Sequence, residues 1–123
     1  HFKDTNTQPK DYDLIVTGDL GSLGKSITMD LVKDSGFELA GVYEDCGVLI
    51  YDAKKQNVES GGSGCGCSAV VLCAHLLKEV RKGKLNKLLF VGTGALMSPV
   101  SLQQGESIPG IAHAVVIENK RSV

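Results

Sequence analysis

The sequence carries no excess of charge of either sign. Thirteen lysine and arginine residues stand against fourteen aspartate and glutamate residues, so the formal net charge is −1. A protein that binds a nucleic acid usually presents a basic patch or arm, and the tail around Lys120 and Arg121 is too short to act as one. We therefore expect no nucleic-acid partner.

Long apolar runs are also missing. No segment reaches about 18 consecutive apolar residues, and the first residues, HFKDTNTQPKDYD, lack the apolar core of a signal peptide. These absences predict a soluble chain without a transmembrane helix. Disulfides are rare in the reducing interior of cells, so the four cysteines are expected to be free thiols.

What the sequence does contain is typical of one α/β domain, with 42% hydrophobic and 22% charged residues. Short apolar runs bounded by turn residues predict strands at 13–19, 38–43, 48–52, 87–94 and 112–118. Helical spacing predicts helices at 21–36, where Leu23, Ile27 and Leu31 recur with Met29 and Val32 offset, and at 67–83. A loop with Pro99 and Pro109 is expected before the last strand. This alternation predicts an α/β layered domain, and the start at His1 rather than Met suggests a fragment.

The helix predicted at 67–83 is apolar nearly all round. From Ala69 to Leu77, only His75 is polar. A helix without a polar face is buried on every side, so we expect this helix to lie between two sheets. A chain of 123 residues cannot easily supply both sheets, and a second half or a second copy is therefore expected to cover it.

The segment GGSGCGCSAVVLC, residues 61–73, leads into this helix and admits three interpretations. Its glycines could let the backbone turn tightly beneath a sheet. Its N–H groups at a helix N-terminus could bind an anion, and Cys67 could be a nucleophile with a lowered pKa and His75 or His113 as its base. Cys65 and Cys67 could be half of a metal site, but the other half is missing.

The stretch DLGSLGKS, residues 19–26, is close to a phosphate-binding loop. It follows a strand, opens a helix and ends in Gly-Lys-Ser, but Asp19 stands where the first glycine of that motif belongs. A carboxylate there would repel phosphates, and no later strand ends in an acid that could hold magnesium. We therefore expect no nucleotide hydrolysis and interpret Lys25 as a solvated residue of the first helical turn.

Five stretches, in this order and spacing, carry a resemblance to a known family: DYDLIVTGDLG, EDCGVLIYD, GGSGCGCSAVV, LLFVGTGALMSP and PGIAHAVVIE. They resemble the C-terminal half of the stage V sporulation protein AD family of spore-forming Bacillaceae, over essentially the whole chain. That family resembles thiolases and ketoacyl synthases, whose fold stacks two similar halves as α-β-α-β-α layers. The resemblance implies that residues 1–123 form the C-terminal half of a thiolase-like fold, with the helix at 67–83 in the central layer.

The resemblance also implies that acyl-transfer chemistry is lost. Ketoacyl synthases of this type hold the thioester carbonyl with a His after the first strand and an Asn before the buried helix. Those positions fall on Gly18 and Cys65 in this sequence. Because each such donor typically contributes about 2.7 to 4 kcal/mol to acyl transfer, losing both implies a protein that is not an enzyme. The alternative is an acyl-transferring enzyme that uses Cys65 or Cys67 instead.

The function implied by the resemblance is binding of dipicolinic acid, which is taken up into the developing spore and released at germination. This ligand is a flat ring with two carboxylates and suits a slot lined by glycine loops and helix N-termini, with no further cofactor. The candidate ligand-binding residues are Thr17, Gly18, Asp19, Cys65, Gly66, Cys67, Gly92, Thr93 and Gly94. A branched side chain at Gly66 or Gly94 is predicted to weaken binding, because the ligand approaches the backbone closely.

The resemblance extends to partners and location. Asp19 and Asp45 could bind a calcium ion carried with the ligand, or could be turn and cap residues. The expected protein partners are spore membrane channel subunits of the same operon, and the missing N-terminal half or a second copy. The expected location is the forespore and spore, peripheral to the inner membrane.

Overall fold

The structure, a computed structural model, describes residues 1–95, 98–108 and 110–119 as one α/β arrangement, which confirms the predicted fold class. The strands are β1 (Leu14–Thr17), β2 (Tyr43–Asp45), β3 (Lys87–Val91) and β4 (Ala114–Glu118). The helices are α1 (Phe2–Thr5), the 3₁₀ turn η1 (Pro9–Asp11), α2 (Gly21–Asp34), α3 (Cys46–Leu49), α4 (Cys67–Val71), the π-helical turn η2 (Leu72–Leu76), α5 (Leu77–Arg81) and α6 (Pro99–Gln103).

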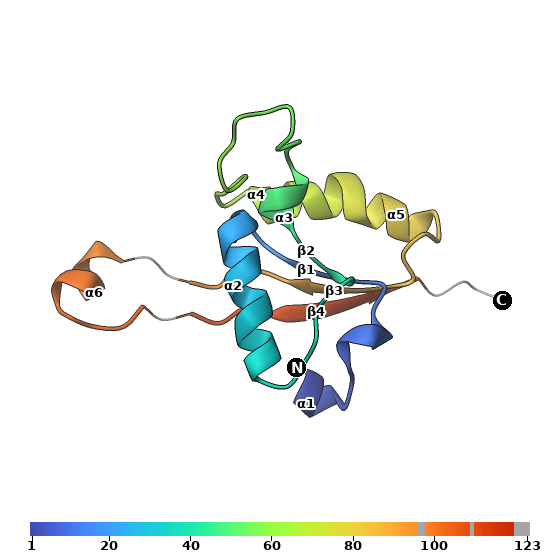
Figure 1. Cartoon of the computed structure of the whole chain (residues 1–123), viewed down its shortest axis with the longest axis horizontal. Coiled ribbons are helices and arrows are strands. Elements are labelled where there is room, and N and C mark those ends of the chain that lie inside the picture. The colour runs from blue at the N-terminus through green and yellow to red at the C-terminus, as the bar shows by residue number, and fades with distance from the viewer. Residues whose placement is uncertain (96–97, 109, 120–123) are drawn as a thin grey trace.

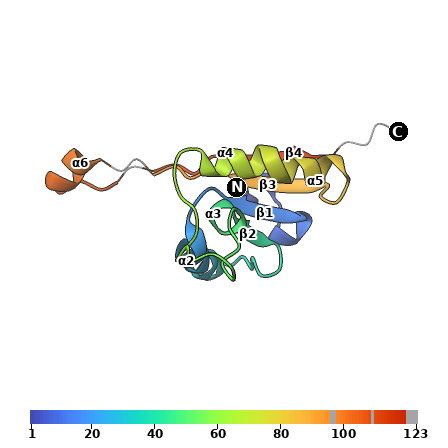
Figure 2. The same cartoon turned by 90° about the horizontal axis from the view of Figure 1, so that it is seen from above.

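The four strands form one mixed sheet in the order β2-β1-β3-β4, so β1 and β3 lie in its centre. β1 is parallel to both β2 and β3, whereas β4 is antiparallel to β3. Parallel neighbours require a crossover connection, and α2 and the helix α4–η2–α5 provide the two crossovers. Figures 1 and 2 show these helices on opposite sides of the sheet, the arrangement expected for half of a thiolase-like fold.

The central strands contribute to two separate cores. The core on the α4–α5 side contains Val16, Cys46, Cys67, Val71, Leu76, Val80 and Leu88. The core on the α2 side contains Tyr12, Ile15, Leu39, Tyr43 and Leu89. Because successive side chains of a strand point to opposite faces, the neighbours Ile15 and Val16 belong to different cores.

The helix α4–η2–α5 contributes more buried residues than any other helix of the described chain, but it is buried on one side only. Its inward residues are Cys67, Val71, Leu76 and Val80. Its outward residues are Ala69, Val70, Cys73, Ala74 and His75, all of them exposed. One sheet can cover only one face of a helix, so the covering of the other face by a second half or a second copy stays a prediction. Between residues 69 and 77 the exposed side nevertheless has no polar stripe.

The helix α2 forms where it was predicted, but the apolar residues that marked it face outward. Leu23, Ile27 and Leu31 are 65%, 50% and 62% exposed, whereas Met29 and Val32 pack against the core. Both sets of apolar residues have helical spacing, so the spacing predicts the helix but not which set faces the sheet. In the structure, Met29 and Val32 are the ones that pack against the core.

The strand predicted at 48–52 is wrong, because α3 occupies the start of that segment. The Asp45 carboxylate accepts a hydrogen bond from the Gly47 N–H at 2.9 Å, which caps α3 at its first turn. In a short apolar run, the periodicity of the residues cannot distinguish a strand from a buried helical turn. The strand predicted at 38–43 begins only at Tyr43, because Gly41 has a φ of 84°, outside the β region.

The segment between β3 and β4 forms an arm that projects from the body of the molecule, with α6 near its tip (Figure 1). A hydrogen bond of 2.9 Å from the Ile111 N–H to the Gly94 carbonyl closes the base of the arm. The predicted loop is therefore present but contains α6. Pro109 and the tail residues Lys120 and Arg121 lie outside the described residues.

Candidate ligand-binding site

The carboxyl ends of three parallel strands meet at one edge of the sheet. Thr17, the last residue of β1, pairs with Asp45 of β2 and with Val91 of β3. In open parallel sheets, the crevice outside these ends is the usual place for a ligand. The loops at 18–20, 60–66 and 92–94 are joined to one another at this edge, so most of the candidate residues come together here.

Asp45 is the centre of this edge. Its side chain is 0% exposed and accepts four hydrogen bonds. The Thr17 hydroxyl and the Leu20 N–H donate to Oδ2 at 2.7 and 3.0 Å. The Gly21 and Gly47 N–H groups donate to Oδ1, both at 2.9 Å. A buried carboxylate is tolerated when hydrogen bonds replace its water, and these four donors do so. Of the two interpretations of Asp45, the structure therefore supports that of a turn and cap residue.

The N-terminus of α2 explains why DLGSLGKS does not form a phosphate site. The first N–H groups of α2 and of the turn before it point to the Asp45 carboxylate and to the Ser60 carbonyl, which accepts from Ser22 at 2.7 Å. An internal anion thus occupies the position that a phosphate would take. Lys25 pairs with Glu44 at 2.8 Å and lies over the Tyr43 ring, so the prediction that Lys25 is solvated is wrong.

Asp19 links the three loops. Its carboxylate accepts from the Gly64 N–H at 2.9 Å and from the Ser63 hydroxyl at 3.1 Å, and its own N–H donates to the Thr93 hydroxyl at 3.1 Å. The hydrogen bond with the Thr93 side chain lowers the pKa of Asp19, the Gly64 and Ser63 donors lower it further, and partial burial opposes them. Asp19 therefore stays ionised and acts as a turn residue that ties β1 to the glycine loop and to the base of the arm.

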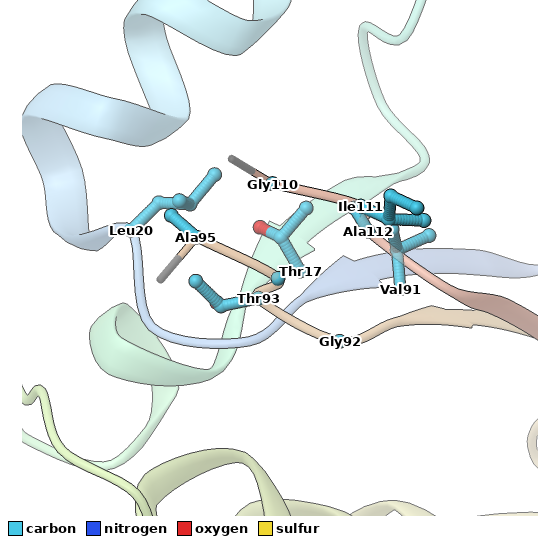
Figure 3. Close-up of a pocket in the computed structure, with 10 residues that line it drawn as sticks. Thr17, Leu20, Val91, Gly92, Thr93, Ala95, Gly110, Ile111 and Ala112 are labelled. Atoms are coloured by element: carbon cyan, nitrogen blue, oxygen red, sulfur yellow. The ribbon is translucent and has the colours of Figure 1, made fainter. Parts of the chain in front are cut away.

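A pocket of about 280 Å³ opens beside these loops (Figure 3). Its lining residues are Thr17, Leu20, Val91, Gly92, Thr93, Gly94, Ala95, Gly110, Ile111 and Ala112. Figure 3 shows Leu20 on one side of the opening and Ile111 and Ala112 on the other. Four of the nine candidate residues line this pocket, namely Thr17, Gly92, Thr93 and Gly94. Leu20 and residues 110–112 were missed, because only the hydrogen bond between Ile111 and Gly94 brings the returning segment of the arm to this place.

The candidates Gly18 and Asp19 lie next to the pocket and support it. Gly18 is buried, and a side chain at this position would collide with Thr93. Gly18 therefore permits the close approach of the β1 end to the arm. The glycine loop contacts Asp19 through Ser63 and Gly64, and its residues Cys65, Gly66 and Cys67 are not among those that line the pocket.

The glycines at 61–73 mainly serve packing. Side chains at Gly61 and Gly47 would each collide with backbone of the facing segment, and the Gly62 N–H donates to the Gly47 carbonyl at 2.7 Å. Gly66 differs, because its φ is −96° and a side chain there would meet nothing within 4 Å. The prediction that bulk at Gly66 disrupts a site is therefore not supported by its surroundings.

The buried cysteines are not activated. Burial raises the pKa of the Cys67 thiol, and the nearby carboxylates of Asp19 and Asp45 raise it further. Burial and Asp45 raise the pKa of Cys46 to about 12. The lowered pKa that a nucleophile at Cys67 would need is therefore absent. His75 is exposed on its helix, and the one hydrogen bond described for His113 uses its backbone carbonyl.

Two further properties bear on function. In the described part of the chain, no three histidine, cysteine, aspartate or glutamate side chains are grouped so that they could hold a metal ion. None of the helices in residues 1–95, 98–108 and 110–119 combines the length and the hydropathy that crossing a bilayer requires.

Comparison with known proteins identifies the family. Residues 1–118 match the family model described as stage V sporulation protein AD. The chain is 52% identical over 118 residues to the stage V sporulation protein AD of Bacillus subtilis (strain 168). The match covers 96% of this chain and 35% of the relative, so the chain spans about a third of that protein's length. The chain therefore belongs to the stage V sporulation protein AD family, whose name places it in sporulation.

Proposed function

We propose that this chain is the C-terminal half of a thiolase-like protein that binds dipicolinic acid, for its uptake into developing spores and its release at germination. The supporting observation is the pocket, whose lining consists of hydroxyl groups, glycine backbone and apolar side chains, without an acid, a base or a thiol. Acyl transfer needs an activated nucleophile and oxyanion donors. A pocket of this composition favours binding over catalysis.

The shape and polarity of the pocket suit a flat aromatic dicarboxylate. Leu20, Val91 and Ile111 offer apolar surface for the ring, and Thr93 contributes a hydroxyl group to the lining. Among the residues that the structure describes, the lining includes no lysine or arginine, so the two negative charges must be offset by backbone donors, by a calcium ion or by groups of the other half. We therefore expect modest affinity from this half alone.

The exposed side of α4–η2–α5 supports a two-half protein. Ala69, Val70, Cys73 and Ala74 form an apolar surface that water would otherwise contact. In the proposed protein, the N-terminal half covers it. Spore membrane channel subunits of the same operon are the proposed partners, and the proposed location is the inner membrane of the spore, on its periphery.

Titration calorimetry of the full-length protein with dipicolinate, with and without calcium, tests this function. We expect saturable binding with one site per chain. Asp19→Asn removes a negative charge near the pocket, so it is expected to strengthen binding of free dipicolinate and to weaken binding that depends on calcium. Absence of saturable binding in both conditions would overturn the proposal.

Gly94 and Gly66 provide a matched pair for locating the site. A side chain at Gly94 would collide with the Ile111 carbonyl at the base of the arm, whereas Gly66 has space for one. Gly94→Ala is therefore expected to weaken dipicolinate binding at least about tenfold, and Gly66→Ala to change it by less than about twofold. Equal effects of the two substitutions would place the site elsewhere.

The alternative enzyme hypothesis has its own test. Cys65 is an exposed thiol in the glycine loop, and an acyl-transferring enzyme would carry the acyl group on it or on Cys67. The full-length protein is incubated with acyl-CoA and its mass is measured. We expect no adduct, and a stable adduct on either cysteine would favour the enzyme hypothesis.

A further inference from the structure

We infer that Asp45 is the positioning residue of the ligand pocket: its carboxylate, through Thr17 and Leu20, sets the pocket wall before any ligand arrives. The inference rests on the proposed function for the identity of the ligand. Asp45 itself does not line the pocket and has no exposed surface, so it cannot touch the ligand. Its effect must pass through the groups that it holds.

The first link is the contact of one carboxylate oxygen with two pocket residues. Oδ2 of Asp45 accepts from the Thr17 hydroxyl at 2.7 Å and from the Leu20 N–H at 3.0 Å, and both residues line the pocket. Hydrogen bonds to an ionised acceptor are stronger than neutral ones. One oxygen thus fixes the end of β1 and the start of α2 relative to each other.

The second link is the other carboxylate oxygen. Oδ1 accepts from the Gly21 N–H, which opens α2, and from the Gly47 N–H, which opens α3. The orientation of the carboxylate is therefore fixed from two sides, and it cannot rotate without leaving an N–H group unpaired. The Tyr43 hydroxyl lies 2.8 Å from the Thr17 hydroxyl oxygen, so a second hydrogen bond holds the Thr17 side chain in place.

The third link is Asp19, which stands between the two pocket residues in the chain. Its N–H donates to the Thr93 hydroxyl, another pocket residue, and its carboxylate holds the Gly64 N–H. A shift of Leu20 away from Asp45 therefore also moves the residue that connects β1 to the arm. The positions of three lining residues, Thr17, Leu20 and Thr93, therefore depend on one buried carboxylate.

This arrangement makes a specific prediction for Asp45→Asn, because an amide has one acceptor and one donor end. If the amide oxygen accepts from Gly21 and Gly47, the NH₂ group faces the Leu20 N–H. A backbone N–H can only donate, so two donors then face each other and this hydrogen bond is lost. The Thr17 hydroxyl can rotate and accept instead. The substitution preserves size and removes the support of Leu20 selectively.

The experiment compares three full-length proteins: wild type, Asp45→Asn and Asp13→Asn. Asp13 provides the matched control, because its carboxylate also accepts two backbone N–H groups, from Asn86 and Lys87, at the opposite edge of the sheet. Amide hydrogen exchange without ligand reports on residues 18–22. Dipicolinate titration reports on the pocket.

For Asp45→Asn, we expect exchange at residues 18–22 to accelerate about tenfold or more and dipicolinate affinity to fall by a similar factor, whereas Asp13→Asn leaves both within about twofold. Unchanged exchange and affinity in Asp45→Asn would overturn the inference, as would an equal effect of the control. If wild type does not bind dipicolinate, the proposed function fails, and the exchange at 18–22 alone decides whether Asp45 positions the wall.

If Asp45→Asn does not fold, Thr17→Val replaces it. Valine keeps the shape of Thr17 and removes only the hydroxyl donor, and Thr17→Ser restores that donor. We expect weaker dipicolinate binding and faster exchange at residues 18–22 in the valine protein, with both returning toward wild type in the serine protein. Binding and exchange that follow side-chain shape rather than the hydroxyl would overturn the inference.

Discussion

The two sides of the helix α4–η2–α5 have almost the same composition and opposite environments. Leu76 on the inward side is 1% exposed, and Val70 on the outward side is 53% exposed. Cysteine and valine occur on both sides. Apolar character therefore predicted the burial of the inward side correctly, and burial of the outward side stays a prediction.

The comparison also shows what a single sheet can stabilise. The inward residues contact Val16 and Leu88 of the two central strands, whereas nothing in the described chain packs on the outward residues. Burying apolar surface stabilises a protein by about 25 cal/mol per Å², and in the described chain only the inward side gains this free energy. The following five substitutions or measurements test the described burial and its consequences, in order of expected effect.

Leu76→Ala is expected to have the largest effect. The substitution leaves a cavity in the core between the helix and the sheet, and such changes destabilise proteins by about 2 to 5 kcal/mol. Urea unfolding of the full-length protein measures the change. Lys78→Ala, on the exposed side of the same helix, is the control and is expected to stay within about 0.5 kcal/mol. A loss below about 1 kcal/mol for Leu76→Ala would contradict the described core.

Val70→Ala separates the described chain from the proposed two-half protein. If the N-terminal half covers the outward side, the substitution removes buried methyl groups and is expected to destabilise the full-length protein by about 1 to 2 kcal/mol. An uncovered Val70 would contribute less than about 0.5 kcal/mol. A result in the lower range would show that this side faces water.

Thiol alkylation compares the two sides without mutation. We expect an alkylating reagent to modify Cys65 at pH 8 and to modify Cys46 and Cys67 at least about tenfold more slowly, because burial raises the pKa of both. Cys73 is exposed here and becomes protected only if another half covers it. Mass spectrometry of the peptides gives the rates, and fast modification of Cys46 would contradict its position in the core.

The raised pKa of Cys46 has a consequence in alkali. A thiol whose pKa is about 12 in the folded state and near 9 in the unfolded state stabilises the fold below pH 9. That contribution decreases as the pH rises from 9 toward 12. Cys46→Ala is therefore expected to reduce the loss of stability in this range, and an unchanged pH dependence would contradict the burial of the thiol.

Asp19→Asn is expected to have the smallest effect on stability. The pKa of Asp19 is lowered in the folded state, so its contribution is present above pH 3.8 and is lost as the pH falls below that value. Because Asp19 is only partly buried, the expected contribution is less than about 1 kcal/mol. Acid unfolding of the two proteins should differ above pH 3.8 and converge below it. Parallel curves at all pH values would contradict the role of its hydrogen bonds.

Several features of the molecule were predictable from the sequence because they depend on local pattern. The strands β1, β3 and β4 and the helix at 67–81 follow from apolar runs and helical spacing. Gly92, Thr93 and Gly94 were candidates from the family resemblance rather than from local pattern, and all three line a pocket in the structure. These features lie in segments whose apolar residues leave only one stable arrangement.

Other features depended on distant contacts and were missed. α3 replaced a predicted strand, since Asp45 caps it and its apolar run fits either structure. The outward direction of Leu23, Ile27 and Leu31 depended on which stripe the sheet selected. The sequence does not decide between a calcium ligand and a cap at Asp45, because three of its four donors lie in the distant stretch 17–21.

By itself, the sequence determined the α/β class, the central strands and the apolar helix, because hydrophobic period and turn residues act over a few neighbouring positions. Only the tertiary structure decided that the Asp45 carboxylate fills the N-terminus of α2, that Asp19 ties three loops together, and that residues 110–112 complete the pocket. The hydrogen bond between Asp45 and Gly21 joins residues 24 positions apart, and the one between Asp19 and Gly64 joins residues 45 positions apart. Their geometry exists only once the parallel strands have aligned their carboxyl ends.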